Sequence, residues 1–584
     1  MRHAVQHTGL IGGVVEARAY QLEAVDEALA GSMLLVLPTA AGKTAVAWMV
    51  IAEILRKNQG FILFIAPTNP LVDQHIKNLK LVIKNIEEMN LISMTGSTTP
   101  EKRKKLWMSA RIIVATPQVV RNDVLKGTLS LKKCSLLVVD EAHHSTGKHA
   151  MAQTAELYNS ECNKPLILGM TASPGSKTEL VGEICERLKI QRIHMKTSKE
   201  PMLAKYLAGL EIQEIVVNVP EKIRELVNPL ELWINGIVDR ERRTGRYVRP
   251  GNPSFGGLSE AMSRAQHAIS LGDKTAYSSV SQIATAMTLN HLINNLLTQG
   301  IAAAREFLEN SSEITNNTSK SVQNFHKDLR IIELKQNLND MDEIHTKVGT
   351  VRRLIRQRLR RDPQSKVIVF ASFRNTVESL DHALNDLKGV KSVQVIGQSD
   401  RSGKKGLKPK QQIEVLNKFR EGEYNVLVAT SVAEEGLDIP SADLVIFYEP
   451  VGSEIRTIQR RGRTGRHREG EVMVLVAEGT RDENAKISAE KKEKNMQRAV
   501  QRIRRKLPRK VHEDLSNLNN FSVRNDVEEI TASDFIKNIR KENRPEMTEI
   551  DNNELPSINN KTKPLDPSNY RPKGQTGLDE FRKS

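Results

Sequence analysis

Short apolar runs recur along two separated stretches of the chain, and polar segments with helical periodicity lie between them. In residues 34–173 the runs are LLVL, FILFIA, LISM, IIVAT, LLVVD and LILGMTAS, and in residues 366–477 they are KVIVFA, SVQVI, NVLVAT, LVIFYEP and VMVLVA. Strands buried in parallel sheets are near-continuous apolar runs, and strands alternating with helices indicate βαβ units. The pattern predicts an α/β fold with two parallel-sheet lobes.

The rest of the chain has other patterns. From about 200 to 350 helical stretches such as ELWINGIVDRERR and KDLRIIELKQNL replace the strands, and beyond about 540 the chain is too polar to fold alone. We therefore expect a first lobe at 1–200, a helical insert at 201–350, a second lobe at 351–490, a basic helical extension at 491–540 and a disordered basic and polar tail at 541–584.

Length and charge narrow the class of protein. A chain of 584 residues exceeds one hydrophobic core, and its net charge of +17 favours a polyanionic partner. We expect nucleic acid rather than a membrane, since no basic amphipathic anchor helix stands out. The N-terminus has no secretory h-region, and the three cysteines lie far apart, as reduced buried thiols do. These features favour a cytoplasmic, nucleoid-associated location.

The segment PTAAGKT after the run SMLLVL ends like a phosphate-binding loop. In such a loop backbone N–H groups surround the β-phosphate, Lys43 supplies a charge to the β- and γ-phosphates, and Thr44 offers its hydroxyl to Mg²⁺. Leu37 stands where the consensus has glycine, so a core helix without ligand is the alternative for this segment alone. The candidate nucleotide-binding residues of the loop are Thr39, Ala40, Ala41, Gly42, Lys43 and Thr44.

A second candidate segment, SLLVVDEAHH, carries two adjacent carboxylates. Asp140, at the end of a buried strand, would hold Mg²⁺ through water, and Glu141 would accept a proton from the water that attacks the γ-phosphate. Adjacent carboxylates after an apolar run are costly unless a cation compensates them. A plain strand-end turn is the alternative.

The segment IQRRGRTGRHREG carries an array of arginines. The spacing of Arg463 and Arg466 allows both guanidiniums to reach one γ-phosphate across a cleft, as arginine fingers do. A basic turn that binds a phosphate backbone is the alternative.

The order of these segments, with Thr171-Ala172-Ser173 between the acidic segment and the arginine array, resembles superfamily 2 helicases, whose two lobes are RecA-like. That resemblance implies adenine recognition by Arg18 and Gln21 in ARAYQ, and catalytic roles for Lys43, Asp140, Glu141, Gln459, Arg463 and Arg466. It implies that Gly436 and Asp438 join the nucleotide ribose to the nucleic acid. It also implies that the tracking loops of the two lobes contain Ala66–Thr68, Thr95–Gly96, Thr116–Pro117, Phe370–Arg374 and Thr430–Ser431.

Residues 419–484 are more specifically similar to the archaeal Hef helicase and its eukaryotic Fanconi-anaemia M relatives. This resemblance implies an ATP- and Mg²⁺-dependent DNA helicase that remodels stalled forks and Holliday junctions in repair or replication restart. The XPF-type nuclease signature ERKxxxD of full-length Hef is not found in this sequence, which suggests a separate nuclease partner.

Two other functions stay open. The helical insert and motor pattern are shared with RIG-I-like proteins, which favours a double-stranded-RNA-dependent ATPase as the runner-up. The other is an ATPase-inactive scaffold that binds DNA.

Three further segments have candidate roles. The insert segment DRERRTGRYVRPGNP offers arginines for phosphates and Tyr247 for stacking, unless it is a solvated loop, and the basic block at 491–510 is a stronger candidate for DNA phosphates. Gln575, Leu578 and Phe581 resemble a sliding-clamp-binding peptide, or a chance match in a polar tail. His143 is better explained as a relay between nucleotide and strand-binding loops than as a zinc ligand.

Overall fold

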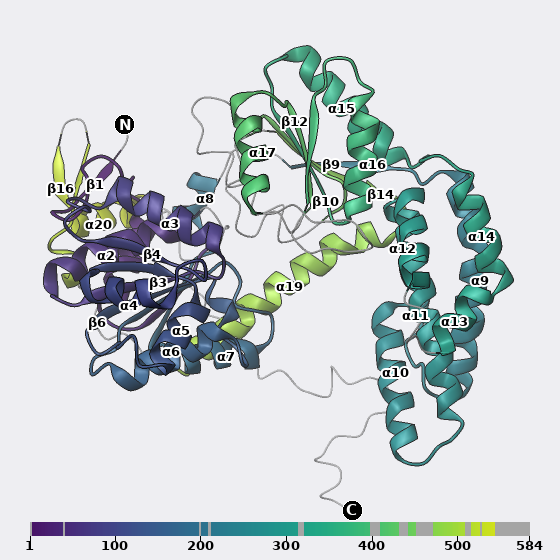
Figure 1. Ribbon diagram of the computed structural model, residues 1–584, viewed down its shortest axis with the longest axis horizontal. Helices are drawn as coiled ribbons and strands as arrows, with labels where there is room; N and C mark the ends of the chain where they lie inside the picture. The colour runs from purple at the N-terminus through teal and green to yellow at the C-terminus, as the bar shows by residue number, and fades with distance from the viewer. Residues whose placement is uncertain are drawn as a thin grey trace, which may run out of the picture. The chain divides into compact units, whose positions relative to one another are not determined.

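The chain folds around two parallel sheets and a group of helices between them in sequence (Figure 1). The computed structural model describes residues 3–38, 41–197, 200–207, 212–313, 320–396, 409–430, 442–450, 471–508, 515–525 and 528–543. Within that part of the chain, no helix combines the length and hydropathy that a membrane span requires. The expected fold class, two parallel-sheet α/β lobes with a helical insert, is confirmed.

The first lobe contains a seven-stranded parallel sheet in the order β4-β5-β3-β6-β7-β2-β8. Its strands are β2 (Met33–Val36), β3 (Phe61–Ile65), β4 (Leu91–Met94), β5 (Ile112–Ala115), β6 (Cys134–Asp140), β7 (Ile167–Thr171) and β8 (Arg192–Met195). Its helical segments are α1 (Ala19–Leu29), α2 (Lys43–Lys57), α3 (Asn69–Val82), α4 (Pro100–Ser109), α5 (Pro117–Leu125), η1 (Ala142–His144), α6 (Ala150–Glu161), α7 (Thr178–Arg187) and α8 (Pro201–Leu207).

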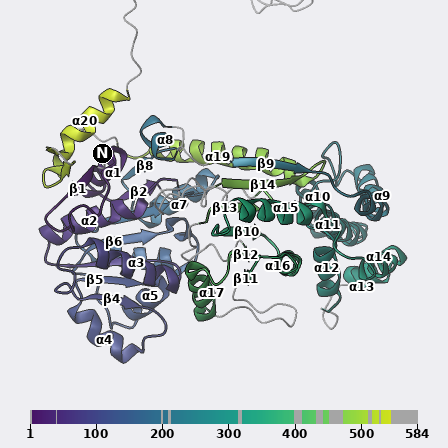
Figure 2. The same cartoon turned by 90° about the horizontal axis from the view of Figure 1, so that it is seen from above.

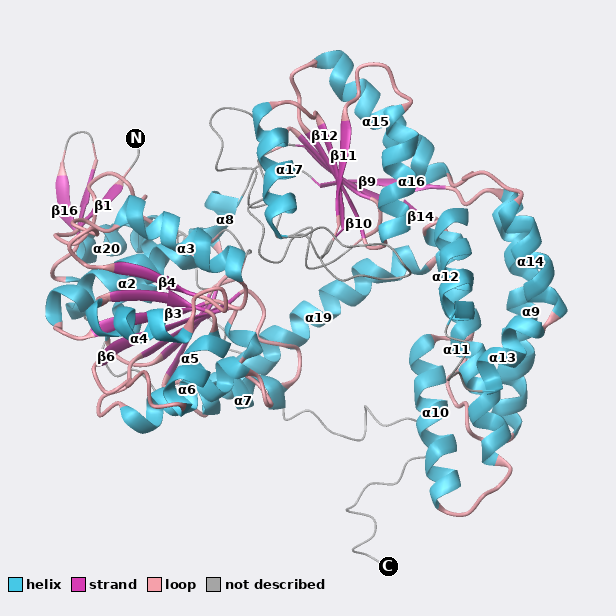
Figure 3. Ribbon diagram, in the orientation of Figure 1, coloured by secondary structure: helices cyan, strands magenta, loops and turns pink. Residues whose placement is uncertain are grey.

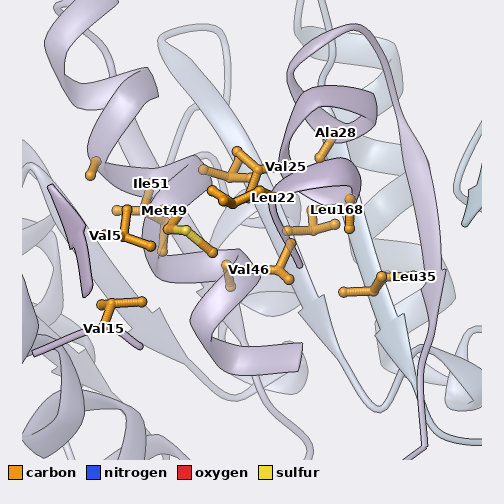
Figure 4. Close-up of a cluster of buried hydrophobic side chains, with 14 of the residues drawn as sticks. Val5, Val15, Leu22, Val25, Ala28, Leu35, Val46, Met49, Ile51 and Leu168 are labelled. Carbon is orange, nitrogen blue, oxygen red and sulfur yellow. The ribbon is translucent and has the colours of Figure 1, made fainter. Parts of the chain in front are cut away.

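The apolar runs of the first lobe are buried on both faces of this sheet. On one face Leu35 of β2 and Leu168 of β7 pack against Leu22 of α1 and Val46 of α2 (Figure 4). On the other face alternate strand residues pack against α5, α6 and α7. Because every central strand is covered twice, its loops are held on a rigid base.

The second lobe has a six-stranded parallel sheet in the order β11-β12-β10-β13-β14-β9. Its strands are β9 (Ile212–Val217), β10 (Val367–Ala371), β11 (Ser392–Val395), β12 (Val426–Thr430), β13 (Leu444–Phe447) and β14 (Glu471–Ala477). The helices α15 (Thr346–Arg361), α16 (Arg374–Asn385) and α17 (Pro409–Glu421) belong to the same lobe. Strand β9 differs from the expectation of an all-helical segment at 201–350, because it pairs with β14, far along the sequence (Figure 2).

The remainder of that segment is helical, as Figure 3 shows. It comprises α9 (Glu221–Arg243), α10 (Phe255–Ser270), α11 (Ala276–Thr298), α12 (Ile301–Glu313), α13 (Lys320–Lys327) and α14 (Leu329–Asn339). Gly300, with a φ of 107°, separates α11 from α12 within a stretch of continuous helical periodicity. A side chain there would meet the Glu343 carboxylate, which accepts bonds from the N–H groups of Ile301 and Ala302.

The insert is joined to the second lobe at the end of α11. Three successive carbonyls accept side-chain hydrogen bonds: that of Leu297 from His345 Nε2 at 3.0 Å, that of Thr298 from Lys347 Nζ at 3.0 Å, and that of Gln299 from Tyr448 at 3.2 Å. The buried Lys347 ammonium also pairs with Asp482 at 2.6 Å. The free carbonyls of a helix end are thus satisfied by donors from another domain.

The expected stacking role of Tyr247 is wrong. Its side chain is 1% exposed, and its hydroxyl accepts a hydrogen bond from the Ser254 N–H at 3.1 Å. It fits there because residue 257 is glycine, where a Cβ would lie 2.5 Å from the tyrosine hydroxyl. Arg246 and Arg249 of the same segment pair with Asp273 and Glu260. These side chains therefore make contacts within the insert itself.

The segments after the second lobe return to the first. Helix α19 (Arg481–Arg504) buries Ala499, Val500 and Ile503 against α7. Farther on, β15 (Ser522–Arg524) pairs with both β1 (Ala4–Gln6) and β16 (Glu529–Thr531). The short helix η3 (Ser516–Leu518) and α20 (Ala532–Glu542) complete this part. The region expected as a helical extension at 491–540 thus includes strands, which add to the first lobe.

Candidate nucleotide and nucleic-acid site

Apart from Arg18 and Gln21 at the start of α1, the predicted segments of the first lobe lie at or directly after the carboxyl ends of parallel strands. They therefore lie along one edge of the sheet. From one side of that edge the strand order β4-β5-β3 brings Thr95–Gly96, Thr116–Pro117 and Ala66–Thr68 together. On the other side of the edge, the phosphate-loop candidate follows β2, Thr171 ends β7 and Asp140 ends β6. The strand order therefore separates the nucleic-acid candidates from the nucleotide candidates, which meet between β3 and β6. Such an edge is where open α/β sheets bind ligands.

The phosphate-loop candidate is braced from α1. Tyr20 Oη and Gln21 Nε2 each donate a hydrogen bond to the Ala41 carbonyl at 2.9 Å. Lys43 Nζ donates to the Leu37 carbonyl at 3.4 Å, across the loop, and Thr44 lies in the first turn of α2. Gln21 thus holds the loop itself, and a role in adenine recognition stays a prediction.

Two structural features favour glycine at position 42. Its φ of 77° lies in the left-handed region, and a Cβ would meet Gln21 Nε2 at 2.1 Å. The helix α2 begins at the next residue, so its N–H groups point to the edge where the loop lies. The sequence GKT therefore provides a helix N-terminus and a lysine together, the combination that phosphate groups prefer.

Arg18 precedes α1 and is held by neighbours. Its guanidinium donates to Glu16 Oε2 at 2.6 Å and to Tyr20 Oη at 3.2 Å, and it lies 4.9 Å from the ring centroid of Tyr206. Arg18 thus forms a cation–aromatic pair with Tyr206 and contacts Tyr20, which braces the loop.

Asp140 is buried at the end of β6, and His75 from α3 is its partner. His75 Nε2 lies 2.8 Å from Asp140 Oδ2, and the Glu141 N–H donates to Oδ1 at 3.1 Å. Burial opposes ionisation of this carboxyl, but the hydrogen bond and charge of His75, with the charge of Lys43, hold the pKa of Asp140 below its ordinary value. Asp140 is therefore a carboxylate at neutral pH.

Glu141 leaves the strand in a left-handed conformation, with φ 51° and ψ 49°. The turn half-exposes its carboxylate, whose Oε2 lies 3.3 Å from His143 Nδ1. The same nitrogen lies 3.2 Å from Thr171 Oγ1 at the end of β7. A non-glycine residue with positive φ is uncommon and is enriched at functional sites. His143 thus touches both the acidic segment and the Thr171 segment, which fits a relay position.

The donor atoms at this edge suit Mg²⁺. Magnesium takes oxygen ligands, usually one or two carboxylates completed by water and substrate phosphates. The ionised Asp140 and the hydroxyl of Thr44 are of that kind, and Lys43 is close enough to lower the pKa of Asp140. No group of three or more His, Cys, Asp or Glu side chains that could hold a metal ion is found among the described residues.

A buried ion pair joins two of the nucleic-acid candidate loops. Arg103 of α4 donates to both oxygens of Asp123 of α5, at 2.7 and 2.8 Å, and Trp107 Nε1 donates to the same carboxylate at 2.9 Å. The Arg103 guanidinium also donates to the Thr98 carbonyl. Since Thr98 follows Thr95–Gly96 and α5 begins at Thr116–Pro117, the pair sets the distance between these loops.

In the second lobe, Phe370–Arg374 runs from the last two residues of β10 to the first residue of α16, and Thr430 ends β12. Glu449, after β13, accepts a hydrogen bond from the Ser372 N–H and one from Gln299 Nε2 at 2.8 Å. Gln299 Oε1 accepts in turn from Thr376 Oγ1 at 3.1 Å. Gln299 of the insert therefore bonds Glu449 and Thr376, and Glu449 in turn bonds Ser372 of the Phe370–Arg374 segment.

Other predicted residues lie outside the described residues. They are Thr39, Ala40, Ser431, Gly436, Asp438, Gln459, Arg463, Arg466, Gln575, Leu578 and Phe581.

The structure also adds residues that sequence patterns missed, among them His75, Arg103 and Asp123. The sequence signal that could have indicated them is a charged or polar residue on the otherwise apolar face of a short amphipathic helix.

The basic block at 491–510 forms the second half of α19 up to Arg504. Its apolar residues Ala499 and Val500 are buried on the first lobe. The exposed basic residues of the block are Lys491, Lys492, Lys494, Arg498, Arg502, Arg504, Arg505 and Lys506. The block is therefore anchored on one side and presents cations on the other.

Comparison with known proteins identifies the class. Residues 18–181 match the family model described as DEAD/DEAH box helicase, and residues 346–468 match the helicase conserved C-terminal domain. The crystal structure of the Pyrococcus furiosus Hef helicase domain is 35% identical and has a TM-score of 0.61, over 81% of this chain and 98% of that one.

The chain therefore belongs to the superfamily 2 helicases of the type that includes Hef, Fanconi anaemia group M protein and Mph1. A Methanocaldococcus jannaschii protein named for ATP-dependent RNA helicase activity is 36% identical over 85% of this chain and 62% of its own length. The ATP-dependent DNA helicase mph1 of Neurospora crassa is 30% identical over 80% of this chain and 41% of its own. The chain thus spans less than two thirds of these relatives.

Proposed function

We propose that this chain is an ATP- and Mg²⁺-dependent DNA helicase that moves on branched DNA such as stalled forks and four-way junctions. The observation that carries the proposal is the edge of the first sheet, where nucleotide candidates and nucleic-acid candidates are neighbours and are joined by the His75–Asp140 bond. The family to which the chain belongs supports the same function.

The chain's own groups have distinct roles toward ATP. Lys43 and the N-terminus of α2 bind the β- and γ-phosphates, and Tyr20 and Gln21 keep the loop in place through the Ala41 carbonyl. Glu141 accepts the proton of the attacking water, for which its half-exposed carboxylate is suited. Arg463 and Arg466 add positive charge to the γ-phosphate, as the family resemblance implies.

Mg²⁺ would be held by Asp140 and Thr44, where it would neutralise charge that develops on the phosphates. The ionised state of Asp140 supports this role, since a neutral carboxyl is a poor magnesium ligand.

Coupling between ATP and nucleic acid runs through two contacts. His75 connects Asp140 to α3, which begins directly after the Ala66–Thr68 loop, and His143 connects the acidic segment to Thr171. A shift of Asp140 on hydrolysis would therefore move α3 and the loop before it. Repeated shifts of one set of nucleic-acid-binding loops relative to another convert ATP hydrolysis into stepwise movement along the strand.

DNA is preferred to duplex RNA on the family resemblance, although the Methanocaldococcus relative is named for RNA. The exposed cations of α19 support a phosphate-backbone partner of either kind. The proposal also includes a separate nuclease partner, a sliding clamp bound through Gln575, Leu578 and Phe581, and a cytoplasmic, nucleoid-associated location.

A steady-state ATPase panel tests the proposal. Phosphate release is measured with single-stranded, duplex, forked and four-way DNA and with duplex RNA, and Lys43→Ala is the control. We expect forked and four-way DNA to stimulate hydrolysis most, and Lys43→Ala to abolish it. Stronger stimulation by duplex RNA would favour the RIG-I-like alternative, and no phosphate release with any nucleic acid would favour the inactive scaffold.

A further inference from the structure

Helix α15 of the second lobe carries an unbalanced charge. Its sixteen residues, TKVGTVRRLIRQRLRR, include six arginines and one lysine but neither aspartate nor glutamate. Blocks of like charge commonly mark interaction surfaces. None of the predicted motifs includes these arginines.

Three of the arginines form a straight exposed row. Arg353, Arg356 and Arg360 are exposed and spaced i, i+3, i+7, whereas Val351, Leu354 and Ile355 on the opposite side are buried in the core of the lobe. Gly349 continues the row toward the N-terminus, and the space around its Cα is open. The row spans seven residues, about 10 Å of helix at 1.5 Å per residue.

Several arginines elsewhere in the chain have carboxylate partners, and within the described part of the chain these three do not. Arg103, Arg187, Arg246, Arg249 and Arg330 each have a carboxylate partner. Within α15 itself, Lys347 pairs with Asp482, and Arg358 bonds Ser365 and Glu471. Across the described residues, no ion pair or hydrogen bond is found for Arg353, Arg356 or Arg360.

Helix stability does not account for the row. Cations in the last turn favour the negative end of the helix dipole, which explains Arg358, Arg360 and Arg361. Arg353 and Arg356 lie farther from that end, and like charges three or four residues apart destabilise a helix. The helix dipole thus accounts for Arg360 but not for Arg353 and Arg356.

We propose that the outer face of α15 binds the phosphate backbone of duplex DNA, as a grip on one arm of a branched substrate. Arginine is the cation that donates two parallel hydrogen bonds to phosphate, and the row contains no lysine. The inference rests on the proposed function and adds a contact away from the sheet-edge loops.

A membrane surface fits this face less well. Amphipathic helices bind membranes by inserting apolar side chains, and the exposed residues of α15 are Thr346, Gly349, Arg353, Arg356, Gln357, Arg360 and Arg361. A rigid row of guanidiniums without exposed apolar neighbours matches a charged backbone instead.

The test uses the full chain with Arg353, Arg356 and Arg360 all changed to Gln. The control variant changes three exposed lysines, Lys132, Lys133 and Lys164, to Gln, since they lie at the opposite edge of the first sheet from its candidate loops. Dissociation constants are measured for forked DNA and for single-stranded DNA at several salt concentrations.

We expect the arginine variant to bind forked DNA about tenfold more weakly, with the slope of log K against log salt reduced by about 2 to 3. The arginine variant keeps wild-type affinity for single-stranded DNA and wild-type ATPase activity stimulated by single strands. The control variant keeps wild-type affinity for both kinds of DNA. The charge-preserving triple change to Lys restores most of the affinity for forked DNA.

Unchanged affinity for forked DNA overturns the inference, as does an equal loss for single strands or for the control. Lost binding to phosphatidylserine vesicles with unchanged DNA binding assigns the face to a membrane and also overturns it. If wild-type protein shows no nucleic-acid-stimulated ATPase, the proposed function itself fails, which is a separate result.

Discussion

His75 Nε2 and Asp140 Oδ2 lie 2.8 Å apart, and this bond links the helix after the Ala66–Thr68 loop to the carboxylate proposed to hold Mg²⁺. Both side chains are largely buried. A buried hydrogen bond to a charged group is strong and geometrically demanding, so the two segments cannot move independently.

Replacing His75 by Ala should uncouple nucleic acid from hydrolysis. Without its donor, Asp140 loses the fixed orientation that depends on α3, so we expect DNA-stimulated kcat to fall at least about tenfold. The KM for ATP should change less than threefold. Steady-state kinetics with and without forked DNA check this, with the exposed His382→Ala as control. Equal loss of basal and stimulated rates would mean that His75 only supports the fold.

Replacing Glu141 by Gln should stop turnover without preventing binding. The amide keeps the size and the turn but cannot accept a proton, and loss of a general base lowers rates by about 10² to 10⁴. Single-turnover phosphate release and fluorescent-ATP binding measure the two properties. Turnover near the wild-type rate would remove Glu141 from its proposed role.

Replacing Gly42 by Ala should damage the nucleotide site through a specific clash. The Cβ would lie 2.1 Å from Gln21 Nε2, so the brace on Ala41 must shift. Gly127→Ala is a matched control, because Gly127 also has positive φ, 70°, but nothing lies within 4 Å of its Cβ position.

We expect Gly42→Ala to weaken ATP binding at least about tenfold, a change of roughly 1.4 kcal/mol. Gly127→Ala should cost about 1 kcal/mol of stability through backbone strain alone, with ATP affinity unchanged. Equal effects on ATP binding would show that strain, not the contact with Gln21, matters. Equilibrium titration with fluorescent ATP gives both values.

Replacing Asp123 by Asn should loosen the two tracking loops. The change leaves the buried Arg103 without a charged partner, a loss of about 3 to 5 kcal/mol if nothing relaxes. We expect the DNA concentration for half-maximal ATPase to rise about tenfold, while basal hydrolysis stays within twofold. An unchanged DNA requirement in a folded variant would mean that the loops do not depend on this pair.

The joint between the insert and the second lobe should open in acid. Burial lowers the pKa of His345 to about 4, partly offset by its bond to the Leu297 carbonyl, and Lys347 lowers it further. The unfolded chain therefore binds more protons than the folded chain between about pH 4 and the ordinary value of 6.5. Stability of the joint is complete above pH 6.5 and falls by up to about 3 kcal/mol toward pH 4.

Hydrogen exchange of the last turn of α11, followed between pH 4.5 and 7.5 after correction for intrinsic rates, measures this loss. His345→Gln should flatten the profile, because an amide can donate to the Leu297 carbonyl without titrating. A profile that stays equally steep in the variant would assign the acid sensitivity to another group.

Strands β2 to β7 and β10 to β14, and their order along the chain, follow from apolar runs, since a buried parallel strand has few polar residues. The strand β9 escaped prediction because EIQEIVV mixes polar with apolar residues without a regular pattern, and its partner β14 lies more than two hundred residues later. The strands β15 and β16 escaped for the same reason, since β15 needs β1 beside it.

Side-chain partners are harder to predict than strands. Tyr247 among arginines resembles an exposed stacking residue, and only the space above Gly257 makes its burial possible. His75 carries no motif of its own, because its role depends on the order of β3 and β6 in the sheet. The phosphate loop and the acidic segment were predictable because their chemistry is local in sequence.

The most direct test of the central claim is ATP-driven movement of a four-way DNA junction labelled with a donor and an acceptor fluorophore on adjacent arms. Our account predicts that wild-type protein with ATP and Mg²⁺ separates the labels, and that Glu141→Gln binds the junction but leaves the transfer efficiency unchanged. Junction movement by Glu141→Gln at the wild-type rate, or no movement by wild-type protein that hydrolyses ATP on the same junction, would contradict it.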